Sequence, residues 1–467
     1  MRKTKIIATL GPVTESPEML RTLIDTGVNC FRLNMSHAPH DWVRAIVPRI
    51  RNVARDAGKI VGILMDTQGP AIRTGDLPTK LNLKPGNIFE FTVRGEKSEE
   101  EFSVDVNYDG LIDDISVGDI VLVDNGVIHM KALAKTGNKL RCEVLTEGVM
   151  GSRRHINLPG VKVNLPPLTE KDLADVELGA ELGVDFVALS FCREASDVGV
   201  LRKVLGEHGS DARIVAKIED QLAVKNIASI IDATDVIMVA RGDLGIECPM
   251  EELPIIQRRI VKRCLELGKP VIVATHMLES MIVNPVPTRA EVTDVANAVF
   301  EQADAIMLSG ETTTGKYPVH CVKVLDKVAE RIERSGGLGF AENAVLETDR
   351  EKTVRSAVVL ANSLPDTKLV VFTRSGSMAA FVAGQRPLYA PIYAFTPTWE
   401  LCRKLSLFRA VEPVCMAFDV NPERTILSAE RLLLDRGLVK SGDHIIIVTD
   451  ILAGQDRFDS IQLRRMP

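Results

Sequence analysis

Short apolar runs alternate with longer amphipathic stretches along most of the chain. Brief runs rich in Val, Ile and Phe are typical of buried strands, and apolar residues spaced three and four apart are typical of helices. This alternation predicts βα units around a parallel sheet. Eight strands are predicted, at Lys5–Leu10, Cys30–Met35, Val61–Asp66, Phe186–Phe191, Arg213–Glu219, Asp235–Ala240, Pro270–Thr275 and Ala305–Ser309. Eight βα units are the number that closes a (β/α)8 TIM barrel.

Helix-start signals follow several of these strands. Ser16–Asp25 begins with a serine, Thr169–Leu182 begins with Thr-Glu-Lys, and Thr288–Phe300 carries regularly spaced apolar residues. A Ser or Thr before the first turn accepts hydrogen bonds from backbone N–H groups that the helix itself leaves unpaired. The helix pattern therefore supports the barrel.

Two further segments lie outside the barrel pattern. Residues 68–165 contain alternating segments such as Asn87–Val93 and Asp119–Val123, separated by Gly and Asp turns, and predict a small inserted β-barrel cap domain. After Asp349 the pattern restarts with a helix at Thr353–Ser363 and predicts a C-terminal α/β domain. Its strands are predicted at Leu369–Thr373, Ile392–Phe395, Val411–Ala417 and His444–Thr449. The predicted boundaries are 1–67 with 166–340 for the barrel, 68–165 for the cap and 345–467 for the C-terminal domain.

Composition narrows the class of protein. Among 467 residues, 57 are basic and 63 acidic, and no long basic run or basic-aromatic stripe occurs, so we expect no nucleic-acid partner. The eight cysteines have no metal-type spacing, which predicts reduced thiols. No signal-like apolar core precedes the first strand, and no stretch of about 18 apolar residues occurs. We therefore expect a cytoplasmic protein with no membrane partner.

Charged residues mark the ends of the fifth and sixth predicted strands, where TIM barrels place their working groups. Lys217 and Glu219 are two apart, so both side chains point to one face of the strand. Asp243 follows the next strand in Arg-Gly-Asp-Leu-Gly. Glu219 and Asp243 could hold one magnesium ion, which takes one or two carboxylates and fills its shell with water and substrate oxygens. The alternatives are an internal salt bridge for the Lys217–Glu219 pair and a plain Asp-Gly turn for Asp243.

Other strand ends carry polar groups too. Arg32, Asn34 and Ser36 alternate and so share a face, and burying all three for packing alone would be costly. Asp66 and Thr67 supply oxygen ligands at the third strand. Arg73 supplies a second guanidinium, unless it is a solvated loop charge. Thr275 would point a hydroxyl into the same mouth, unless it is an ordinary β-branched strand residue.

Together these residues resemble the pyruvate kinase family over nearly the whole chain. The matching segments are Thr4–Pro12, Arg32–His37, Asp66–Gly75, Ile156–Gly160, Met238–Gly245, Pro287–Asn297 and Met307–Thr312. The resemblance implies phosphoryl transfer from phosphoenolpyruvate to ADP, which gives pyruvate and ATP in the last step of glycolysis. It also implies a homotetramer.

The resemblance also implies roles for single residues. Glu219 and Asp243 would bind Mg²⁺, or Mn²⁺ in its place, and Lys217 would stabilise charge on the transferring phosphoryl group. Arg32 and Arg73 would clamp phosphates, whereas Gly242, Asp243 and Thr275 would line the phosphoenolpyruvate site. Thr275 would lie beside the carbon that receives a proton. The nucleotide-binding set would be Asn34, His37, Arg73 and Arg154, and the K⁺ ligands would be Asn34, Ser36, Asp66 and Thr67.

Three substitutions depart from the family pattern. Gln68 replaces a usual Lys, Ala71 replaces a Glu common in potassium-activated members, and His276 replaces a Gln. None removes a predicted magnesium ligand. K⁺ is expected as a cofactor. The requirement for it stays open, because Ala71 carries no charge.

Phe372–Ser377 predicts a candidate effector site in the C-terminal domain. The segment follows a strand and opens a helix, which suits anion binding by backbone N–H groups and by the hydroxyls of Thr373, Ser375 and Ser377. The resemblance implies a sugar-phosphate or nucleotide effector there. The alternative is an ordinary turn in which Ser377 caps the helix.

Two rival functions stay open at this stage. One is a magnesium-dependent lyase or aldolase that acts through a pyruvate enolate, since related barrels hold magnesium with a Glu and Asp pair. The other is a catalytically silent effector-binding paralogue, which should have lost Lys217 or a metal ligand. Lys217, Arg73 and the cap favour phosphoryl transfer over both.

Overall fold

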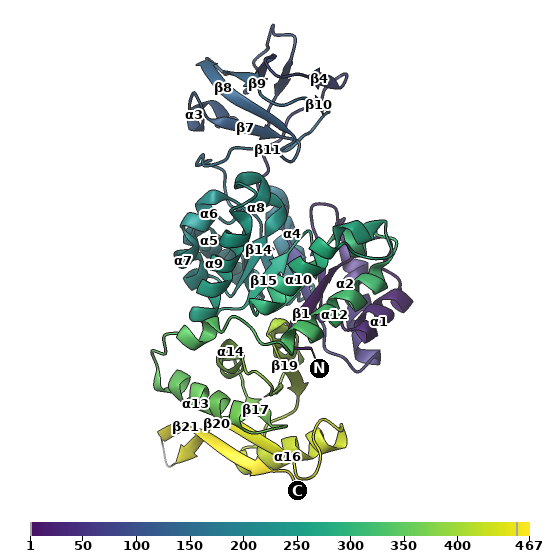
Figure 1. Ribbon diagram of the computed structural model, residues 1–467, viewed down its shortest axis with the longest axis vertical. Helices are drawn as coiled ribbons and strands as arrows, with labels where there is room; N and C mark the ends of the chain where they lie inside the picture. The colour runs from purple at the N-terminus through teal and green to yellow at the C-terminus, as the bar shows by residue number, and fades with distance from the viewer. Residues whose placement is uncertain (1, 454–455) are drawn as a thin grey trace.

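The computed structural model describes residues 2–453 and 456–467, with side chains described outside 450–458. The chain builds three parts stacked along one long axis, with the cap at one end, the barrel in the middle and the C-terminal domain at the other end (Figure 1). No helix in the described part of the chain is long and apolar enough to cross a membrane.

The predicted barrel is confirmed. Its eight parallel strands close in the order β1-β16-β15-β14-β13-β12-β3-β2, and each agrees with its predicted range to within two residues. The strands are β1 (Lys5–Thr9), β2 (Cys30–Asn34), β3 (Gly62–Asp66), β12 (Phe186–Leu189), β13 (Arg213–Ile218), β14 (Val236–Ala240), β15 (Val271–Ala274) and β16 (Ala305–Leu308). Almost all of their residues are buried, because helices cover the outside of the barrel and side chains fill its inside.

The barrel helices begin where the sequence places capping residues. Ser16 accepts a hydrogen bond from Met19 N, and Thr169 and Thr288 both form capping boxes. The helices are α1 (Pro17–Thr26), α2 (His40–Asp56), α4 (Glu170–Glu181), α5 (Ala195–Glu207), α6 (Gln221–Lys225), α7 (Ile227–Ala233), α8 (Arg241–Glu247), α9 (Leu253–Glu266), α10 (Arg289–Phe300), α11 (Gly310–Thr313) and α12 (Pro318–Glu333), with short 3₁₀ turns η1 (Glu279–Ile282) and η2 (Phe340–Asn343).

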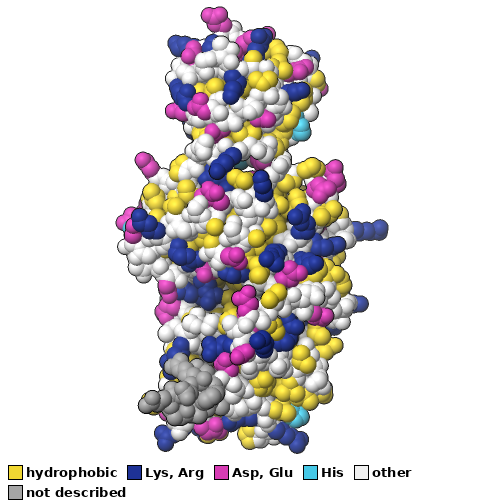
Figure 2. Space-filling view, turned by 90° about the vertical axis from the view of Figure 1, so that its left-hand side faces the viewer, with side chains coloured by type: hydrophobic (Ala, Val, Ile, Leu, Met, Phe, Trp, Pro, Cys, Tyr) yellow, Lys and Arg dark blue, Asp and Glu magenta, His cyan; other side chains and the backbone are white. Residues whose placement is uncertain are grey.

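The insertion between β3 and β12 forms the cap. Its strands pair as a six-stranded sheet, β11-β7-β8-β9-β5-β6, and a two-stranded sheet, β10-β4, which enclose one apolar core that includes Phe89 and Phe91. The elements are β4 (Leu81–Leu83), β5 (Ile88–Thr92), β6 (Ser103–Asp105), α3 (Leu111–Asp114), β7 (Ile120–Val123), β8 (Ile128–Thr136), β9 (Lys139–Val144), β10 (Gly148–Met150) and β11 (Ile156–Asn157). A narrow waist joins the cap to the barrel, and charges of both signs are interspersed over the face that Figure 2 shows.

The C-terminal domain is a sheet of order β19-β18-β17-β20-β21 with helices packed on it. Its elements are α13 (Asp349–Ser363), β17 (Lys368–Phe372), α14 (Ser377–Gly384), β18 (Ile392–Thr396), α15 (Trp399–Lys404), η3 (Leu405–Leu407), β19 (Val411–Cys415), α16 (Pro422–Asp435), β20 (His444–Ala453) and β21 (Asp456–Arg465). The four predicted strands are present. The antiparallel edge strand β21 was not predicted. Gln455, at the start of the Gln-Asp-Arg-Phe-Asp tail, lies outside the described residues.

Buried ion pairs join the C-terminal domain to the N-terminal ends of the barrel strands. Arg386 Nη1 lies 2.9 Å from Asp304 Oδ1, just before β16, and Arg403 Nε lies 2.8 Å from Asp185 Oδ1, just before β12. Both carboxylates are about 1% exposed. The C-terminal domain therefore docks on the end of the barrel that lies opposite the predicted site.

Candidate active site

Most of the predicted site residues meet in one cavity of about 320 Å³ between the barrel mouth and the cap. Barrel strand ends supply one side, and the cap supplies Arg73 and Arg154. The predicted residues that line the cavity are Arg32, Asn34, Ser36, Thr67, Arg73, Arg154, Lys217, Glu219 and Asp243. The structure brings the barrel residues together because the carboxyl ends of barrel strands share one face, and the cap adds its two arginines from above that face.

The ammonium group of Lys217 is buried among oxygens. Its Nζ donates to Ser190 Oγ at 2.7 Å and lies 3.0 Å from Glu219 Oε1 and 3.2 Å from Asp66 Oδ1. Burial alone would lower the pKa of Lys217, but the two carboxylates raise it above its ordinary value. The lysine is therefore held protonated. The alternative of a Lys217–Glu219 salt bridge exists as a contact, and it lies within the cavity rather than apart from it.

Asp66 also fixes Arg32. Arg32 Nε donates to Asp66 Oδ2 at 2.6 Å, and Arg32 Nη1 donates to Thr9 Oγ1 at 3.2 Å. Burial alone would raise the pKa of Asp66, but Lys217 and Arg32 lower it below its ordinary value. One buried carboxylate thus orients two cations toward the cavity. Ser190, at the end of β12, was not predicted, although its place after a strand end was a usable signal.

Glu219 and Asp243 stand at the predicted metal position. Glu219 directly follows β13 and accepts a hydrogen bond from Phe191 N at 2.6 Å, while Asp243 lies in the first turn of α8. Burial, opposed by Lys217 and reinforced by Asp243, raises the pKa of Glu219 above its ordinary value. A bound cation would offset the cost of burying the ionised carboxylate of Glu219. Among the described residues, no three His, Cys, Asp or Glu side chains group as a metal site by themselves. Two carboxylates suit magnesium, whose other ligands are water and substrate oxygens.

Thr275 adopts an unusual backbone conformation directly after β15. Its φ is +64°, a region that β-branched residues rarely enter. Its Oγ1 accepts from Gly242 N and donates to Ala274 O, both at 2.7 Å. Arg241 stabilises this turn by donating to Thr275 O at 2.6 Å, and it pairs with Asp294 at 2.8 Å. Thr275 is therefore not an ordinary strand residue, and Arg241 is a supporting residue for which the sequence predicted no role.

Several of the predicted K⁺ ligands already form hydrogen bonds or ion pairs with other groups of the protein. Asn34 Oδ1 accepts from Ser36 N at 3.3 Å, and Thr67 Oγ1 donates to Ala188 O at 3.0 Å. Asp66 is shared by Arg32 and Lys217, as described above. Ala71 lines the same cavity without a charge.

The predicted nucleotide residues fall into two adjoining cavities. Arg73 and Arg154 reach the cavity at the barrel mouth from the cap, where Arg154 Nη1 lies 3.2 Å from Asp124 Oδ1. His37 instead lines a second cavity of about 620 Å³, beside Trp42. Arg32 and Asn34 line both cavities and so mark where they meet. Arg73 is exposed, and its Nη1 donates to Arg153 O at 3.4 Å.

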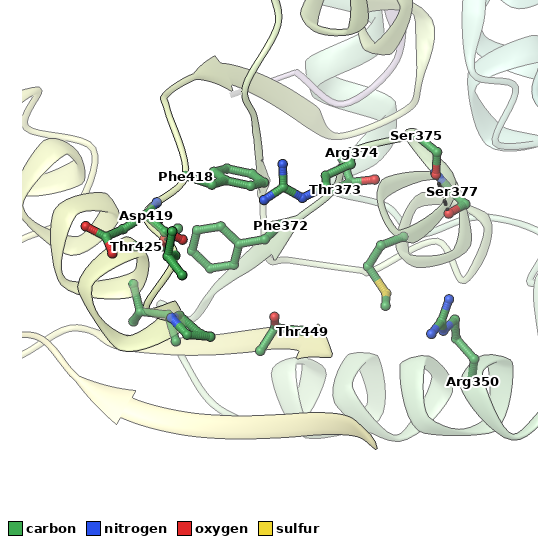
Figure 3. A pocket seen from close by; sticks show the side chains of 14 residues that line it. Arg350, Phe372, Thr373, Arg374, Ser375, Ser377, Phe418, Asp419, Thr425 and Thr449 are labelled. Carbon is green, nitrogen blue, oxygen red and sulfur yellow. Dashed lines mark hydrogen bonds between the residues drawn. The ribbon is translucent and has the colours of Figure 1, made fainter. Parts of the chain in front are cut away.

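The candidate effector residues line a cavity of about 330 Å³ in the C-terminal domain (Figure 3). Thr373 Oγ1 accepts from Gly376 N at 2.8 Å, and the hydroxyls of Ser375 and Ser377 lie 2.9 Å apart. Gly376, with φ of +90°, precedes the first residue of α14, and no side chain caps this helix. The alternative in which Ser377 caps the helix is therefore wrong. The guanidinium of Arg374 stacks on the ring of Phe418, 5.0 Å from its centre.

The barrel is closed and capped, one carboxylate at its mouth fixes two cations, and two further carboxylates lie beside them. These features are typical of barrel enzymes that act on phosphorylated substrates. Comparison with known proteins gives the family. The family model described as "Pyruvate kinase, barrel domain" matches residues 1–322, and the family model described as "Pyruvate kinase, alpha/beta domain" matches residues 351–462. The chain belongs to the pyruvate kinase family.

Individual relatives agree with this family. The chain is 42% identical over 452 residues to the chloroplastic pyruvate kinase isozyme G of Nicotiana tabacum, and the match covers 96% of this chain and 80% of that protein. It is 39% identical over 468 residues to a pyruvate kinase of Staphylococcus aureus, covering 97% and 79%. A crystal structure of a pyruvate kinase from Cryptosporidium parvum has a TM-score of 0.95 and 34% identity, and the match covers 100% of this chain and 96% of that one.

Proposed function

We propose that this chain transfers the phosphoryl group of phosphoenolpyruvate to ADP, forming pyruvate and ATP as the last step of glycolysis. The observation that carries the proposal is the buried Lys217 ammonium beside Glu219, with Asp243 lining the same cavity from the end of the neighbouring strand, β14. Phosphoryl transfer needs positioning and charge stabilisation more than covalent chemistry, and this arrangement supplies both. The lyase and silent-paralogue alternatives lack a comparable observation in their favour.

Each residue has a proposed role in that reaction. Lys217 stabilises charge on the phosphoryl group, Arg32 and Arg73 orient phosphate oxygens, and Gly242, Asp243 and Thr275 position phosphoenolpyruvate. Thr275 Oγ1 lies beside the carbon that is protonated after transfer. Nucleotide phosphates are held near Asn34 and His37 on the barrel side and near Arg154 on the cap side. Glu219 and Asp243 hold Mg²⁺ or Mn²⁺, which neutralises phosphate charge when bound.

Removing the charge of Lys217 tests the proposal. We expect Lys217→Met to lower kcat by about a thousandfold or more while the protein stays folded. Lys225→Met is the matched control, because Lys225 is exposed and makes no hydrogen bond or ion pair with a described residue. Pyruvate formation from phosphoenolpyruvate, ADP and Mg²⁺ is measured. A wild-type protein that forms pyruvate only from an aldol substrate would favour the lyase, and a protein inactive on both would favour the silent paralogue.

We also propose that K⁺ binds at Asn34, Ser36, Asp66 and Thr67. Asn34, Ser36 and Thr67 line the cavity, but the buried Asp66 already neutralises two cations and Ala71 adds no charge. We therefore expect weak K⁺ activation. Activity is compared in K⁺ and in tetramethylammonium buffers, and Ala71→Glu is expected to increase the K⁺ effect. Equal activity of both proteins in both buffers would contradict this site.

The remaining features concern regulation and assembly. A sugar-phosphate or nucleotide effector is proposed to bind at Thr373, Ser375 and Ser377, in the cavity of Figure 3.

A homotetramer is proposed from the resemblance and is tested by sedimentation. The domain boundaries predicted above are kept as a proposal. The cytoplasm is the proposed location, and cell fractionation tests it; the word chloroplastic in the name of the tobacco relative describes that protein.

A further inference from the structure

A separate cavity of about 800 Å³ lies between the barrel and the C-terminal domain. The barrel contributes Arg213 and Lys269, and the C-terminal domain contributes Phe381, Phe408 and the loop of residues 374–377. This interdomain cavity shares only Arg374, Ser375 and Ser377 with the cavity of Figure 3. The loop that opens α14 therefore has a cavity on each side.

Arg213 is the unusual residue of the interdomain cavity. Its guanidinium is partly buried and stacks on the ring of Phe408, 5.0 Å from the ring centre, yet it makes no hydrogen bond or ion pair with any described residue. It also presses against the loop, since a side chain on Gly376 would place its Cβ 2.6 Å from Arg213 Nη2. Burial lowers the pKa of Arg213, and Asp235 and Asp211 offset this only in part. A protonated guanidinium withdrawn from water without a partner is costly.

Other charged groups around the interdomain cavity already have partners. Arg202 pairs with Asp235 at 3.3 Å, and Lys404 pairs with Asp211. Lys269 donates to Thr234 O at 2.6 Å, and Glu400 lies 3.8 Å from Arg403. Across the loop, Arg374 has only its stacking contact with Phe418 among the described residues. The N–H groups of Arg213 are thus available to an anion in the interdomain cavity, and the carboxylates near it are engaged elsewhere. The guanidinium of Arg374 lies on Phe418, which lines only the cavity of Figure 3.

We propose that the interdomain cavity binds a phosphate monoester with an apolar or aromatic group. Its phosphate would accept hydrogen bonds from Arg213 and from the exposed hydroxyls of Ser375 and Ser377. Its apolar part would pack on Phe381 and on Leu205, which also line the cavity. The site is distinct from the effector site of Figure 3, because its charged anchor, Arg213, comes from the barrel.

Arg213 lies on the same barrel strand as Lys217, so the proposed site is connected to the active site through that strand. Arg213 is the first residue of β13, and Lys217 lies four residues further along the same strand. An anion at the interdomain cavity would hold one end of the strand whose other end carries the catalytic ammonium and Glu219. Binding there is therefore positioned to change the affinity for phosphoenolpyruvate.

Calorimetric titration with phenyl phosphate tests the proposal. The full-length protein is first saturated with phosphoenolpyruvate and Mg²⁺, without ADP, so that the active site is filled. We expect Arg213→Gln to weaken binding by at least about tenfold, because a charged hydrogen-bond donor to phosphate is lost. Arg202→Gln is the matched control, since Arg202 lines the same cavity but is already paired, and we expect less than about a twofold change. Arg350→Gln reports on the Figure 3 cavity, because Arg350 lines that cavity and not the interdomain cavity.

A measurement on the wild-type protein removes any dependence on folding of the variant. Modification of Arg213 by phenylglyoxal is followed by peptide mass spectrometry, and we expect phenyl phosphate to slow it by about tenfold at saturation. The proposal is overturned if Arg213 reacts at the same rate with and without the probe. It is also overturned if phenyl phosphate does not bind below about 10 mM, or if Arg350→Gln abolishes binding while Arg213→Gln does not change it.

Discussion

Asp66 and Arg32 form a direct contact at the barrel mouth, with 2.6 Å between Asp66 Oδ2 and Arg32 Nε. The second oxygen of Asp66 lies 3.2 Å from the ammonium of Lys217. The carboxylate therefore aligns the two cations that we propose act on phosphate. If Asp66 lost its charge, Arg32 would keep only its contact with Thr9, and Lys217 only those with Ser190 and Glu219.

Asp66→Asn is accordingly expected to lower kcat by about 100-fold, because small displacements of positioning groups are expensive in rate. Asp76→Asn is a suitable control, since Asp76 is an exposed partner of Arg153. Steady-state rates of pyruvate formation measure both variants. An Asp66→Asn protein with wild-type kcat would show that Arg32 and Lys217 are positioned by other contacts.

Thr275→Val should impair the site by removing the acceptor for Gly242 N. An amide left without a partner costs about 1–3 kcal/mol, which corresponds to roughly a 5- to 150-fold fall in kcat/KM for phosphoenolpyruvate. Thr275→Ser keeps the hydroxyl and is expected to retain most of the activity. If Thr275→Ser and Thr275→Val are equally impaired, the hydroxyl is not the important group.

Loss of a metal ligand should appear as a change in metal requirement. We expect Glu219→Gln and Asp243→Asn to raise the Mg²⁺ concentration for half-maximal activity by at least about tenfold. Removing the metal with a chelator should abolish wild-type activity, and added Mg²⁺ should restore it. The control is Glu18→Gln, because Glu18 lies on the surface at the start of α1. An unchanged Mg²⁺ requirement in both site variants would place the ion elsewhere.

The contact between Glu333 and Arg409 predicts a pH dependence of stability. Burial alone would raise the pKa of Glu333, but Arg409 and the N–H groups of Thr4 and Lys3 lower it below its ordinary value. A carboxylate with a depressed folded-state pKa stabilises the protein above its ordinary pKa, and this contribution is lost as the pH falls. Glu333→Gln should therefore lower the free energy of unfolding at pH 7, by about 1–3 kcal/mol.

The same comparison at lower pH provides the check on Glu333. Urea unfolding of both proteins is measured from about pH 7 down to about pH 2, because the contribution is present above the ordinary pKa of Glu, about 4.3, and is lost only as the pH falls through the lower folded-state pKa. The two unfolding curves should approach each other as the pH falls. A difference that stays constant over this range would show that the charge of Glu333 does not contribute.

Local sequence patterns predicted the barrel well, because each strand run is apolar and each helix start carries its own cap, as at Ser16, Thr169 and Thr288. Position at strand ends likewise brought Lys217, Glu219 and Asp243 together. Contacts between segments that are distant in the sequence could not be predicted from such local patterns. The hydrogen bond from Lys217 to Ser190 depends on how two barrel strands lie side by side. The alternative in which Ser377 caps a helix was wrong, because Gly376, with its left-handed backbone, takes the cap position and Ser377 is the first helical residue.

The docking of the C-terminal domain has a consequence for how this chain can vary. Asp304 and Asp185 are buried at the base of the barrel and neutralised by Arg386 and Arg403 from a segment encoded much later in the chain. Loss of Arg386 would strand the negative charge of Asp304 in the interior, whereas joint replacement of both partners by apolar residues would not. Asp185 keeps a second partner, because Arg51 Nη2 lies 2.8 Å from its Oδ2. Substitutions at Asp304 and Arg386 should therefore be inherited together, whereas Arg403 is freer to vary.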